Sequence, residues 1–322
     1  MREQLGLLQF QISKFLLDRE YAERFSGALL AAAAAHLREL YAMLVSPLLS
    51  RVSAEQLVIV PHGALHYLPF HALFDGERFL IDRLPISYAP SATVYHLCRA
   101  RTQEAPPRSL VLGVPDHRAP GILDEVRAVS ASLPAPSVFV GQDATAGRLR
   151  ELGRDARYVH VATHGLFRLD NPLFSAIRLG DGEMSLLDLH QLRLSADLVT
   201  LSGCGTGLSA VVGGDELVGL VRGLLYAGAR TVLVTLWDVN DNSASTFMRA
   251  FYGQLARDGH KGRAMTAAMQ EVREAWPHPY FWAPFALVGD PEPAPYINRL
   301  AEPPTSSGRS QSVAGARGGE GR

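Results

Sequence analysis

One cysteine and one histidine stand where a nucleophile and its proton acceptor would be expected. Cys204 follows the apolar run 198–201 and has a glycine on either side. His164 comes forty residues earlier, again just after an apolar run and directly before Gly165. A thiolate is a strong nucleophile near neutral pH, and an imidazole can take the thiol proton and return it to a leaving amine. This pairing indicates acyl transfer, most naturally hydrolysis of a peptide bond.

The glycines beside the cysteine suggest how such a site would stabilise a reaction intermediate. Glycine lets backbone N–H groups point into a site without steric cost. The backbone N–H groups of Gly165 and Cys204 are the two candidate donors to an oxyanion, and each such donor contributes roughly 2.7–4 kcal/mol. The sequence therefore predicts an oxyanion hole built from main-chain amides.

Four further residues are candidates for substrate binding. Asp215, Glu216 and Asp238 would favour a basic substrate side chain if they face inward, and Trp237 stands at a strand end where a pocket wall would be. Each has an alternative interpretation. The carboxylates could cap helices or pair with helix dipoles, and the tryptophan could be a core residue.

The cysteine also has other interpretations. A single cysteine after an apolar strand is often a small packed residue. The pattern Gly203-x-Gly205-x-Gly207 could instead bind a phosphate between a strand and a helix. Against a phosphate, no lysine or arginine lies between residues 194 and 221, and the next helix begins with Asp215 and Glu216. Two carboxylates at a helix start would repel a phosphate.

Other histidines favour structural roles. His62, His66 and His71 lie across a strand turn with no cysteine nearby, so packing or surface positions are favoured over a metal site. His160 shares the strand face of His164, and a packed strand histidine is favoured over a supporting role in the site. The sequence predicts no metal and no cofactor.

The elements that must position these residues alternate between strands and helices. We expect strands at 57–60, 86–89, 109–113, 137–140, 158–162, 198–201, 231–236 and 286–288, and extended segments at 67–74 and 79–81. Residues 173–186 should form a hairpin or an excursion, with its turn at 180–182. Helices are expected at 91–101, 121–132, 145–152, 215–227, 240–256 and 263–276. This order predicts an α/β fold with a mostly parallel sheet covered by helices on both faces. Because ligands bind at the carboxyl ends of such strands, His164, Cys204 and the Trp237-Asp238 pair should converge.

Composition limits the partners and the compartment. The net charge of −1 and the scattered basic residues give no reason to expect nucleic acid. No signal peptide is recognisable, and the apolar run near the start, 27–35, is far short of the roughly 20 apolar residues of a membrane span. Only two cysteines occur, Cys98 and Cys204, which is typical of a reducing compartment. We expect a soluble cytoplasmic protein.

The chain divides into three parts by pattern. Residues 1–50 predict helices at 5–18 and 20–49, which could end an upstream array of helical repeats. Residues 51–295 carry the α/β pattern. Residues 296–322 are rich in Pro, Ser, Gly and Arg and cannot bury enough apolar surface to offset ordering entropy, so a disordered tail is expected.

Several segments in order resemble one known family, the CHAT domain, a caspase-like cysteine peptidase family related to separase. The resemblance runs from about residue 20 to 290 and rests on residues 59–65, 68–70, 86–91, Ala162-Thr163-His164-Gly165, Leu201-Ser202-Gly203-Cys204-Gly205-Thr206-Gly207, 228–229, 236–239 and 279–285. One departure is Gly205-Thr206, where the family commonly has Glu-Thr after the cysteine. It bears on the conformation of that loop and on the charge of the pocket.

The resemblance implies a caspase–hemoglobinase fold, with the family histidine at His164 and its cysteine at Cys204. It also implies an arrangement in which a CHAT domain follows tetratricopeptide repeats that sense a partner and release the peptidase. The helices in residues 1–50 would then be the junction to such an array.

The resulting hypothesis is a cysteine endopeptidase with Cys204 as nucleophile and His164 as general acid–base. An extended protein or peptide substrate would lie along the sheet edge, with its pocket formed by the loops after Cys204 and Trp237. The glycine-rich loop 205–214 is expected to be mobile until substrate or a regulatory partner completes the site. The rivals are a catalytically silent scaffold or signalling module of the same fold and a nucleotide-binding switch.

Overall fold

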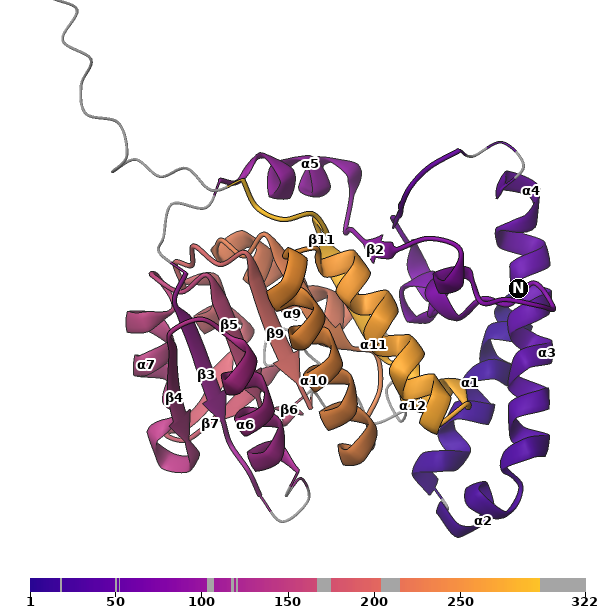
Figure 1. Cartoon of the computed structure of the whole chain (residues 1–322), viewed down its shortest axis with the longest axis horizontal. Helices are drawn as coiled ribbons and strands as arrows, with labels where there is room; N and C mark the ends of the chain where they lie inside the picture. Colours follow the sequence, from indigo (N-terminus) through magenta and orange to yellow (C-terminus); the bar gives the residue numbers. More distant parts are fainter. Residues whose placement is uncertain are drawn as a thin grey trace, which may run out of the picture.

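A computed structural model shows a twisted central sheet between two helical layers, with a group of N-terminal helices beside it (Figure 1). It describes residues 1–17, 19–49, 51, 53–102, 107–116, 119, 121–166, 175–203 and 215–295, except for the side chains of 16, 17, 19, 23, 166 and 215–218. The loop 205–214, Cys204 and the tail 296–322 lie outside the described residues, so the predictions made for them stay predictions.

Within these residues the main sheet has eight strands in the order β1-β2-β11-β10-β9-β5-β3-β4. Their bounds are β1 Leu57–Ile59, β2 Ile86–Tyr88, β3 Ser109–Gly113, β4 Pro136–Val140, β5 Tyr158–Ala162, β9 Leu198–Ser202, β10 Thr231–Thr235 and β11 Phe285–Gly289. Strand β11 runs antiparallel to β10, and the other described pairings in this sheet are parallel. Every residue of β3, β5, β9 and β10 is buried, as expected for parallel strands covered on both faces.

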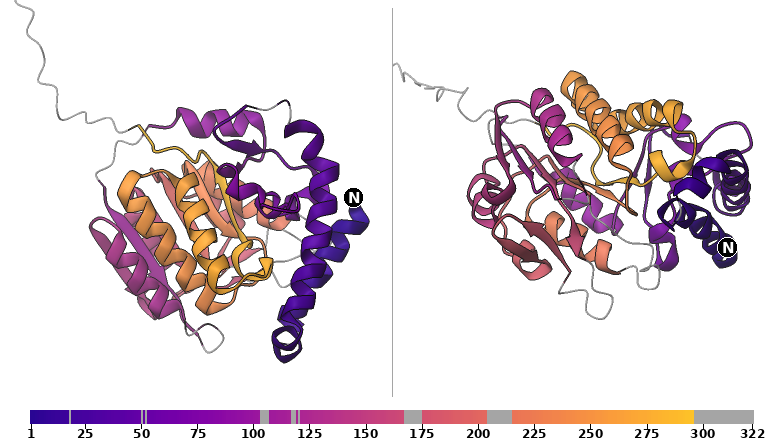
Figure 2. Two further views of the ribbon diagram at one scale, coloured as in Figure 1. Left: turned by 45° about the vertical axis from the view of Figure 1, so that its right-hand side comes forward. Right: turned by 90° about the horizontal axis from the view of Figure 1, so that it is seen from below.

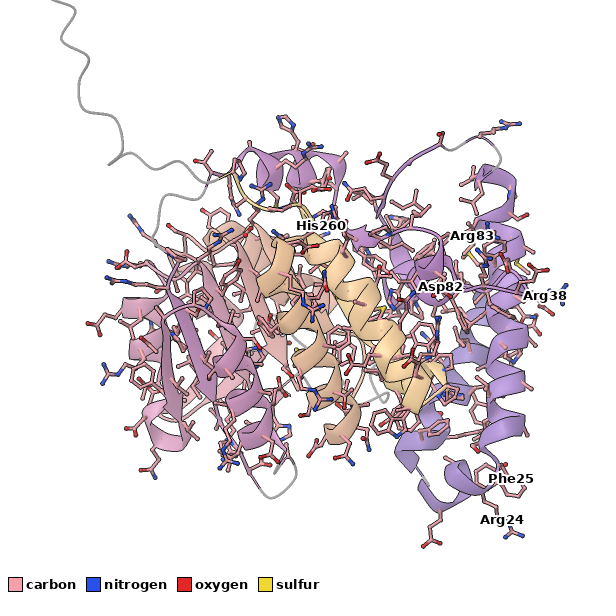
Figure 3. All side chains as sticks on the ribbon, viewed as in Figure 1. Arg24, Phe25, Arg38, Asp82, Arg83 and His260 are labelled. Atoms are coloured by element: carbon pink, nitrogen blue, oxygen red, sulfur yellow. The ribbon has the colours of Figure 1, made fainter. Side chains whose placement is uncertain are left out.

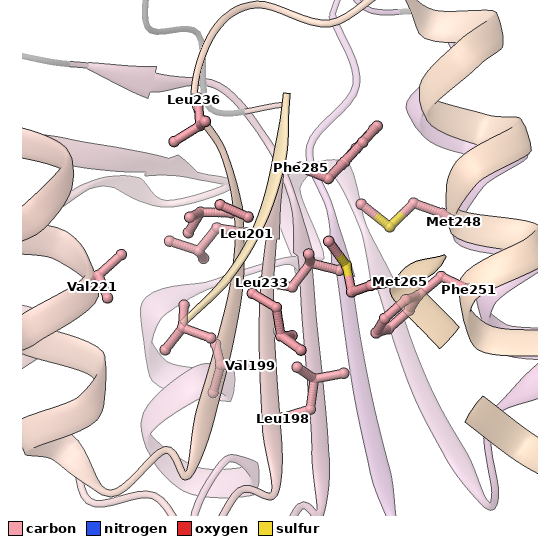
Figure 4. Packing of buried hydrophobic residues seen from close by; sticks show 14 of the residues in the cluster. Leu198, Val199, Leu201, Val221, Leu233, Leu236, Met248, Phe251, Met265 and Phe285 are labelled. Atoms are coloured by element: carbon pink, nitrogen blue, oxygen red, sulfur yellow. The ribbon is translucent and has the colours of Figure 1, made fainter. Parts of the chain in front are cut away.

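Helices cover both faces of this sheet. The helices of the α/β part are α5 Ala92–Ala100, α6 Ile122–Ser132, α7 Ala146–Leu152, α8 Leu186–His190, α9 Asp215–Ala227, α10 Asp241–Asp258, α11 Lys261–Ala275 and α12 Pro279–Trp282. Figure 4 shows Val221 of α9 on one side of the strands, and Met248 of α10 and Met265 of α11 on the other. The alternation of side chains along β9 produces this division, because Val199 and Leu201 face α9 while Leu198 faces the opposite layer.

A small second sheet stands beyond the end of β5. It consists of β6 Gly165–Leu166, β7 Ala176–Leu179 and β8 Gly182–Ser185, paired antiparallel. The turn between β7 and β8 lies where the expected hairpin placed it. This sheet matters for the site because β6 begins immediately after His164.

The chain between β1 and β2 corrects one prediction. The segments 67–74 and 79–81 were expected to be extended, but the structure has the short 3₁₀ turns η1 Gly63–Tyr67, η2 Phe70–Ala72 and η3 Leu80–Asp82, joined by a single bridge between Phe74 and Phe79. Pro69 lacks an N–H group for a strand ladder. His71 bonds to the Tyr88 hydroxyl at 2.8 Å and to the Ala283 carbonyl at 3.0 Å, so side-chain contacts anchor this segment.

The N-terminal helices are α1 Arg2–Leu17, α2 Arg19–Arg24, α3 Ser26–Leu44 and α4 Ser46–Leu49. The expected single helix 20–49 is therefore divided, and Pro47 in α4 cannot donate the hydrogen bond that would continue α3. Helices α1 and α3 stand side by side away from the sheet (Figure 2). In the α1–α12 contact, Phe15 stacks on Tyr280 with ring centroids 5.0 Å apart.

A partly buried ion pair connects the segment after β1 to the helical layer. Asp82 of η3 binds Arg273 of α11 with Nη2 and Oδ1 2.7 Å apart, and Figure 3 shows it between the N-terminal helices and α11. The guanidinium and its hydrogen bonds outweigh burial and lower the pKa of Asp82.

No helix in the described part of the chain is both long enough and apolar enough to cross a membrane.

Candidate active site

The carboxyl ends of two adjacent strands form the centre of the candidate site. Strands β5 and β9 are parallel neighbours, and Ala162 is paired with Ser202. His164 follows the first strand by two residues, and Cys204 follows the second by two. Cys204 lies outside the described residues, so the structure locates the histidine and the strand end that precedes the cysteine.

Gly203 bends the chain at the end of β9. Its φ is +76°, and a Cβ at this position would lie 3.2 Å from the Thr163 carbonyl oxygen. The Thr163 N–H also donates to the Ser202 carbonyl at 2.9 Å. Glycine meets both the left-handed backbone and the close approach of the two strand ends without a steric penalty.

His164 has an acidic partner that sequence reasoning did not identify. Its Nε2 lies 3.1 Å from Oδ1 of Asp116, and Oδ2 of the same carboxylate accepts a 3.2 Å hydrogen bond from Nη1 of Arg178. Asp116 follows β3, the other neighbour of β5, and Arg178 is on β7. The strand-end rule that selects His164 also applies to an aspartate three residues after 109–113, so the sequence does carry a signal for Asp116.

A cavity of about 370 Å³ opens at this edge of the sheet. It lies between the amino-terminal ends of α6 and α10, which are joined by a 3.2 Å hydrogen bond from the Gly121 N–H to Oδ2 of Asp241. Its lining residues are Ala119, Gly121, Ile122, Glu125, His164, Gly165, Ser202, Gly203, Asp238, Val239, Asp241 and Ala244. The strand ends that carry the candidate chemistry therefore border one common space.

The described lining of this cavity is acidic. It contains the carboxylates of Glu125, Asp238 and Asp241 and no lysine or arginine. Burial raises the pKa of Asp238, and the nearby His164 opposes that shift. A carboxylate in such a place is stabilised in its ionised form by a cation. The described charges therefore suit a positively charged occupant.

Below the cavity, a buried polar chain joins the two strands to both covering helices. Nε2 of His160 lies 3.0 Å from Oε1 of Glu125, although the geometry there is not that of a hydrogen bond. Nδ1 of His160 lies 3.1 Å from the Tyr252 hydroxyl, which is 2.7 Å from Oγ1 of Thr200. His160 is fully buried, as predicted for a packed strand histidine.

Of the other predicted site residues with described side chains, some line the cavity and one does not. Gly165 lines the cavity beside His164, and Asp238 lines it from the loop after β10. Trp237 is buried, only 4% exposed, and donates from Nε1 to the Tyr280 carbonyl at 3.0 Å, so it packs beside α12 and does not line the cavity. Asp215 and Glu216 begin α9, but their side chains are outside the described set.

The histidines before β2 make no metal site. Among the residues that the structure describes, no group of three or more His, Cys, Asp or Glu side chains could hold a metal ion. Both ring nitrogens of His71 have protein partners, and burial lowers its pKa to about 4. His66 instead lines a small apolar pocket with Pro61 and Leu236.

Comparison with known protein families shows to which family the chain belongs. The model of the CHAT domain matches residues 34–290. The chain belongs to the CHAT domain family. The match includes the strand ends, the cavity and all the candidate residues named above.

Relatives of this CHAT domain carry it within much longer proteins. Tetratricopeptide repeat protein 28 of Mus musculus is 29% identical over 79% of this chain, and the protein of the same name from Homo sapiens is 28% identical over 79%. The chain spans only 13% of the length of each.

Solved structures with the same fold include peptidases. A separase–securin complex of Saccharomyces cerevisiae aligns with a TM-score of 0.51 at 13% identity, over 74% of this chain and 15% of the other. The Arg-specific cysteine proteinase gingipain R aligns with a TM-score of 0.53 at 8% identity, over 81% of this chain and 67% of the other. These likenesses show that the CHAT domain has the caspase-like fold expected from the sequence.

Proposed function

We propose that this CHAT domain is a cysteine endopeptidase in which Cys204 is the nucleophile and His164 the general acid–base. One observation carries the proposal. His164 lines the same cavity as Ser202 and Gly203, the two residues that immediately precede Cys204. A thiol two residues beyond Ser202 needs only a short path to reach the histidine. The caspase-like fold adds support at the level of architecture.

The reaction follows from these roles. His164 takes the thiol proton, and the sulfur of Cys204 attacks the carbonyl carbon of the scissile peptide. The C–N bond breaks as the imidazolium returns that proton to the leaving amine, and a thioester remains. His164 then takes a proton from water, the resulting hydroxide attacks the thioester, and the sulfur leaves as the carboxylic acid product forms. The backbone N–H groups of Gly165 and Cys204 would hold the oxyanion in both halves.

The acidic cavity suggests the class of side chain that precedes the scissile bond. Asp238 and His164 line the cavity together, and Glu125 and Asp241 line it from α6 and α10. We propose that a lysine or arginine side chain of the substrate binds there. Asp215 and Glu216 would add to this negative charge, and Trp237 would support the Asp238 loop from behind.

The N-terminal helices fit a place for regulation. We propose that residues 1–50 are the junction to upstream helical repeats, residues 51–295 the peptidase domain, and residues 296–322 a flexible tail. The longer relatives are tetratricopeptide repeat proteins, so a repeat array is the expected source of control. A protein partner bound to that array would then govern access to the site.

The test is an acyloxymethylketone probe panel, with mass spectrometry to locate the modified residue. We expect labelling at Cys204 in the parent protein and none in Cys204→Ala or in the denatured parent. Circular dichroism should show the same fold in the parent and in Cys204→Ala. Cleavage of a peptide library should require both Cys204 and His164. Equal cleavage by Cys204→Ala would remove the proposal. If the folded parent shows neither labelling nor cleavage, and Cys204→Ser binds a partner as well as the parent does, the domain is instead a scaffold.

A further inference from the structure

We propose that Asp116 is the positioning residue of His164, fixing the ring through Nε2 so that Nδ1 faces the nucleophile, and that Arg178 holds Asp116 in place. This inference rests on the proposed function for its catalytic meaning. Its structural part, the tautomer and orientation of the ring, can be tested without any activity.

Asp116 contacts His164 directly and is itself fixed. Its Oδ1 lies 3.1 Å from Nε2 of His164 and also accepts the Ala119 N–H at 3.1 Å. Its side chain is 14% exposed, and that of His164 is 28% exposed. The contact is therefore partly shielded from water and less screened than a surface pair.

Arg178 holds the other side of the carboxylate and is tied to the strand end of His164. Its Nη1 donates to Oδ2 of Asp116 at 3.2 Å. The Arg178 N–H donates to the His164 carbonyl at 3.0 Å, and the Arg178 carbonyl accepts from Oγ1 of Thr163. The backbone and side chain of one residue on β7 thus fix both the histidine and its acidic partner.

The chemical consequence is the choice of tautomer. An ionised carboxylate can only accept hydrogen bonds, so Nε2 of a neutral His164 must carry the proton. The lone pair is then on Nδ1, which has no hydrogen-bond partner among the described residues and is available to take the thiol proton. A nearby negative charge also stabilises the imidazolium that this transfer creates. Without Asp116, the ring would be free to rotate and to exchange tautomers.

The first experiment reads the tautomer directly by ¹⁵N NMR of the histidine rings, with the His164 signals assigned from His164→Gln. In the parent protein we expect a neutral ring protonated at Nε2. In Asp116→Ala this preference should be lost, whereas Asp124→Asn, which changes an exposed aspartate on α6, should leave it unchanged. A parent ring protonated at Nδ1 would overturn the inference even if no variant folds. So would an unchanged tautomer in a folded Asp116→Ala.

The second experiment measures how fast iodoacetamide alkylates Cys204 between pH 5 and 9, with Cys98 replaced by alanine. Asp116→Ala should slow alkylation about tenfold at pH 6 and move the acid limb of the profile to higher pH, with little change at pH 9. Asp116→Glu should restore part of the rate, and Arg178→Gln should cause a smaller loss of about threefold, since it loosens the carboxylate without removing it.

An equal loss at every pH would indicate a merely structural role and count against the inference. If Cys204 is no more reactive than free cysteine while the ring retains the Nε2–H tautomer, the peptidase proposal fails and the positioning contact stands.

Discussion

Ala162 of β5 and Ser202 of β9 are paired residues in adjacent parallel strands. This one register relationship sets the geometry of the candidate site. The chains that continue from these two residues leave the sheet at the same level and reach His164 and Cys204 after equal numbers of residues. A shift of the register by one residue would turn the side chains of one strand to the other face of the sheet.

Substrate preference should depend on Asp238. A peptide with arginine before the scissile bond should be cleaved faster than one with aspartate there. Asp238→Asn should lower kcat/KM for the arginine peptide about tenfold or more, because a partly buried carboxylate facing a cation is lost. Glu274→Gln, an exposed change on α11, is the matched control and should leave kcat/KM unaltered. A preference unaffected by Asp238→Asn would place the specificity pocket elsewhere.

Cys98 should be inert in the folded protein. It is 1% exposed, and burial raises the pKa of its thiol, so few thiolates form at neutral pH. We expect Cys98→Ala to leave the rate of probe labelling unchanged, and native mass spectrometry after brief alkylation to detect a single modified cysteine. Modification of Cys98 before Cys204 would contradict this assignment.

Gly203 should be intolerant of a side chain. Gly203→Ala would force a left-handed backbone at a cost of about 1–2 kcal/mol and push a methyl group against the Thr163 carbonyl. Denaturant unfolding should detect that loss, and labelling of Cys204 should slow because the strand end is displaced. Gly253→Ala is the control. This glycine is inside α10 with nothing within 4 Å of an added Cβ, so alanine should raise the free energy of unfolding by about 0.5–1 kcal/mol.

At the sheet edge opposite the cavity, Lys261 should be essential for folding stability. Its Nζ lies 2.7 Å from Oδ1 of Asp197 and 2.6 Å from the Glu292 carbonyl oxygen, and both charged side chains are fully buried. Lys261→Met would leave the aspartate with Arg157 at 3.5 Å and should lower the free energy of unfolding by about 3–5 kcal/mol. Arg127→Met breaks an exposed ion pair and should cause no measurable loss in the same urea titration.

Acid should destabilise the fold partly through His71. Its folded pKa is about 4, below the ordinary value of 6.5, because burial disfavours the charged ring. The unfolded chain therefore binds a proton between these values that the folded protein does not. Its contribution is fully present above pH 6.5 and is lost as pH falls toward 4, by up to about 3 kcal/mol.

The measurement for His71 compares unfolding free energies at pH 7 and pH 4.5. His71→Gln should show a smaller decrease over this interval than the parent protein does, since the titrating ring is gone. An identical decrease in parent and His71→Gln would assign the acid sensitivity to other groups.

Periodicity and strand order predicted much of the fold. Buried parallel strands such as β5 and β9 appear in the sequence as short β-branched runs, and α10 as an amphipathic helix, because these patterns depend on local geometry and burial. The prediction of an extended segment at 67–74 was wrong, because the conformation there depends on a distant partner of His71, the Ala283 carbonyl. No local pattern encodes a contact across more than two hundred residues.

The sequence by itself determined that His164 and Asp238 would come to one edge of a parallel sheet, because connections between parallel strands bring their carboxyl ends together. It also selected Cys204 as the candidate nucleophile, which remains a prediction. Only the tertiary structure decided that Asp116 and Arg178 would join the histidine and that Trp237 would pack against α12. Those contacts depend on the order of strands in space and on the direction of each side chain, and neither is fixed by spacing along the chain.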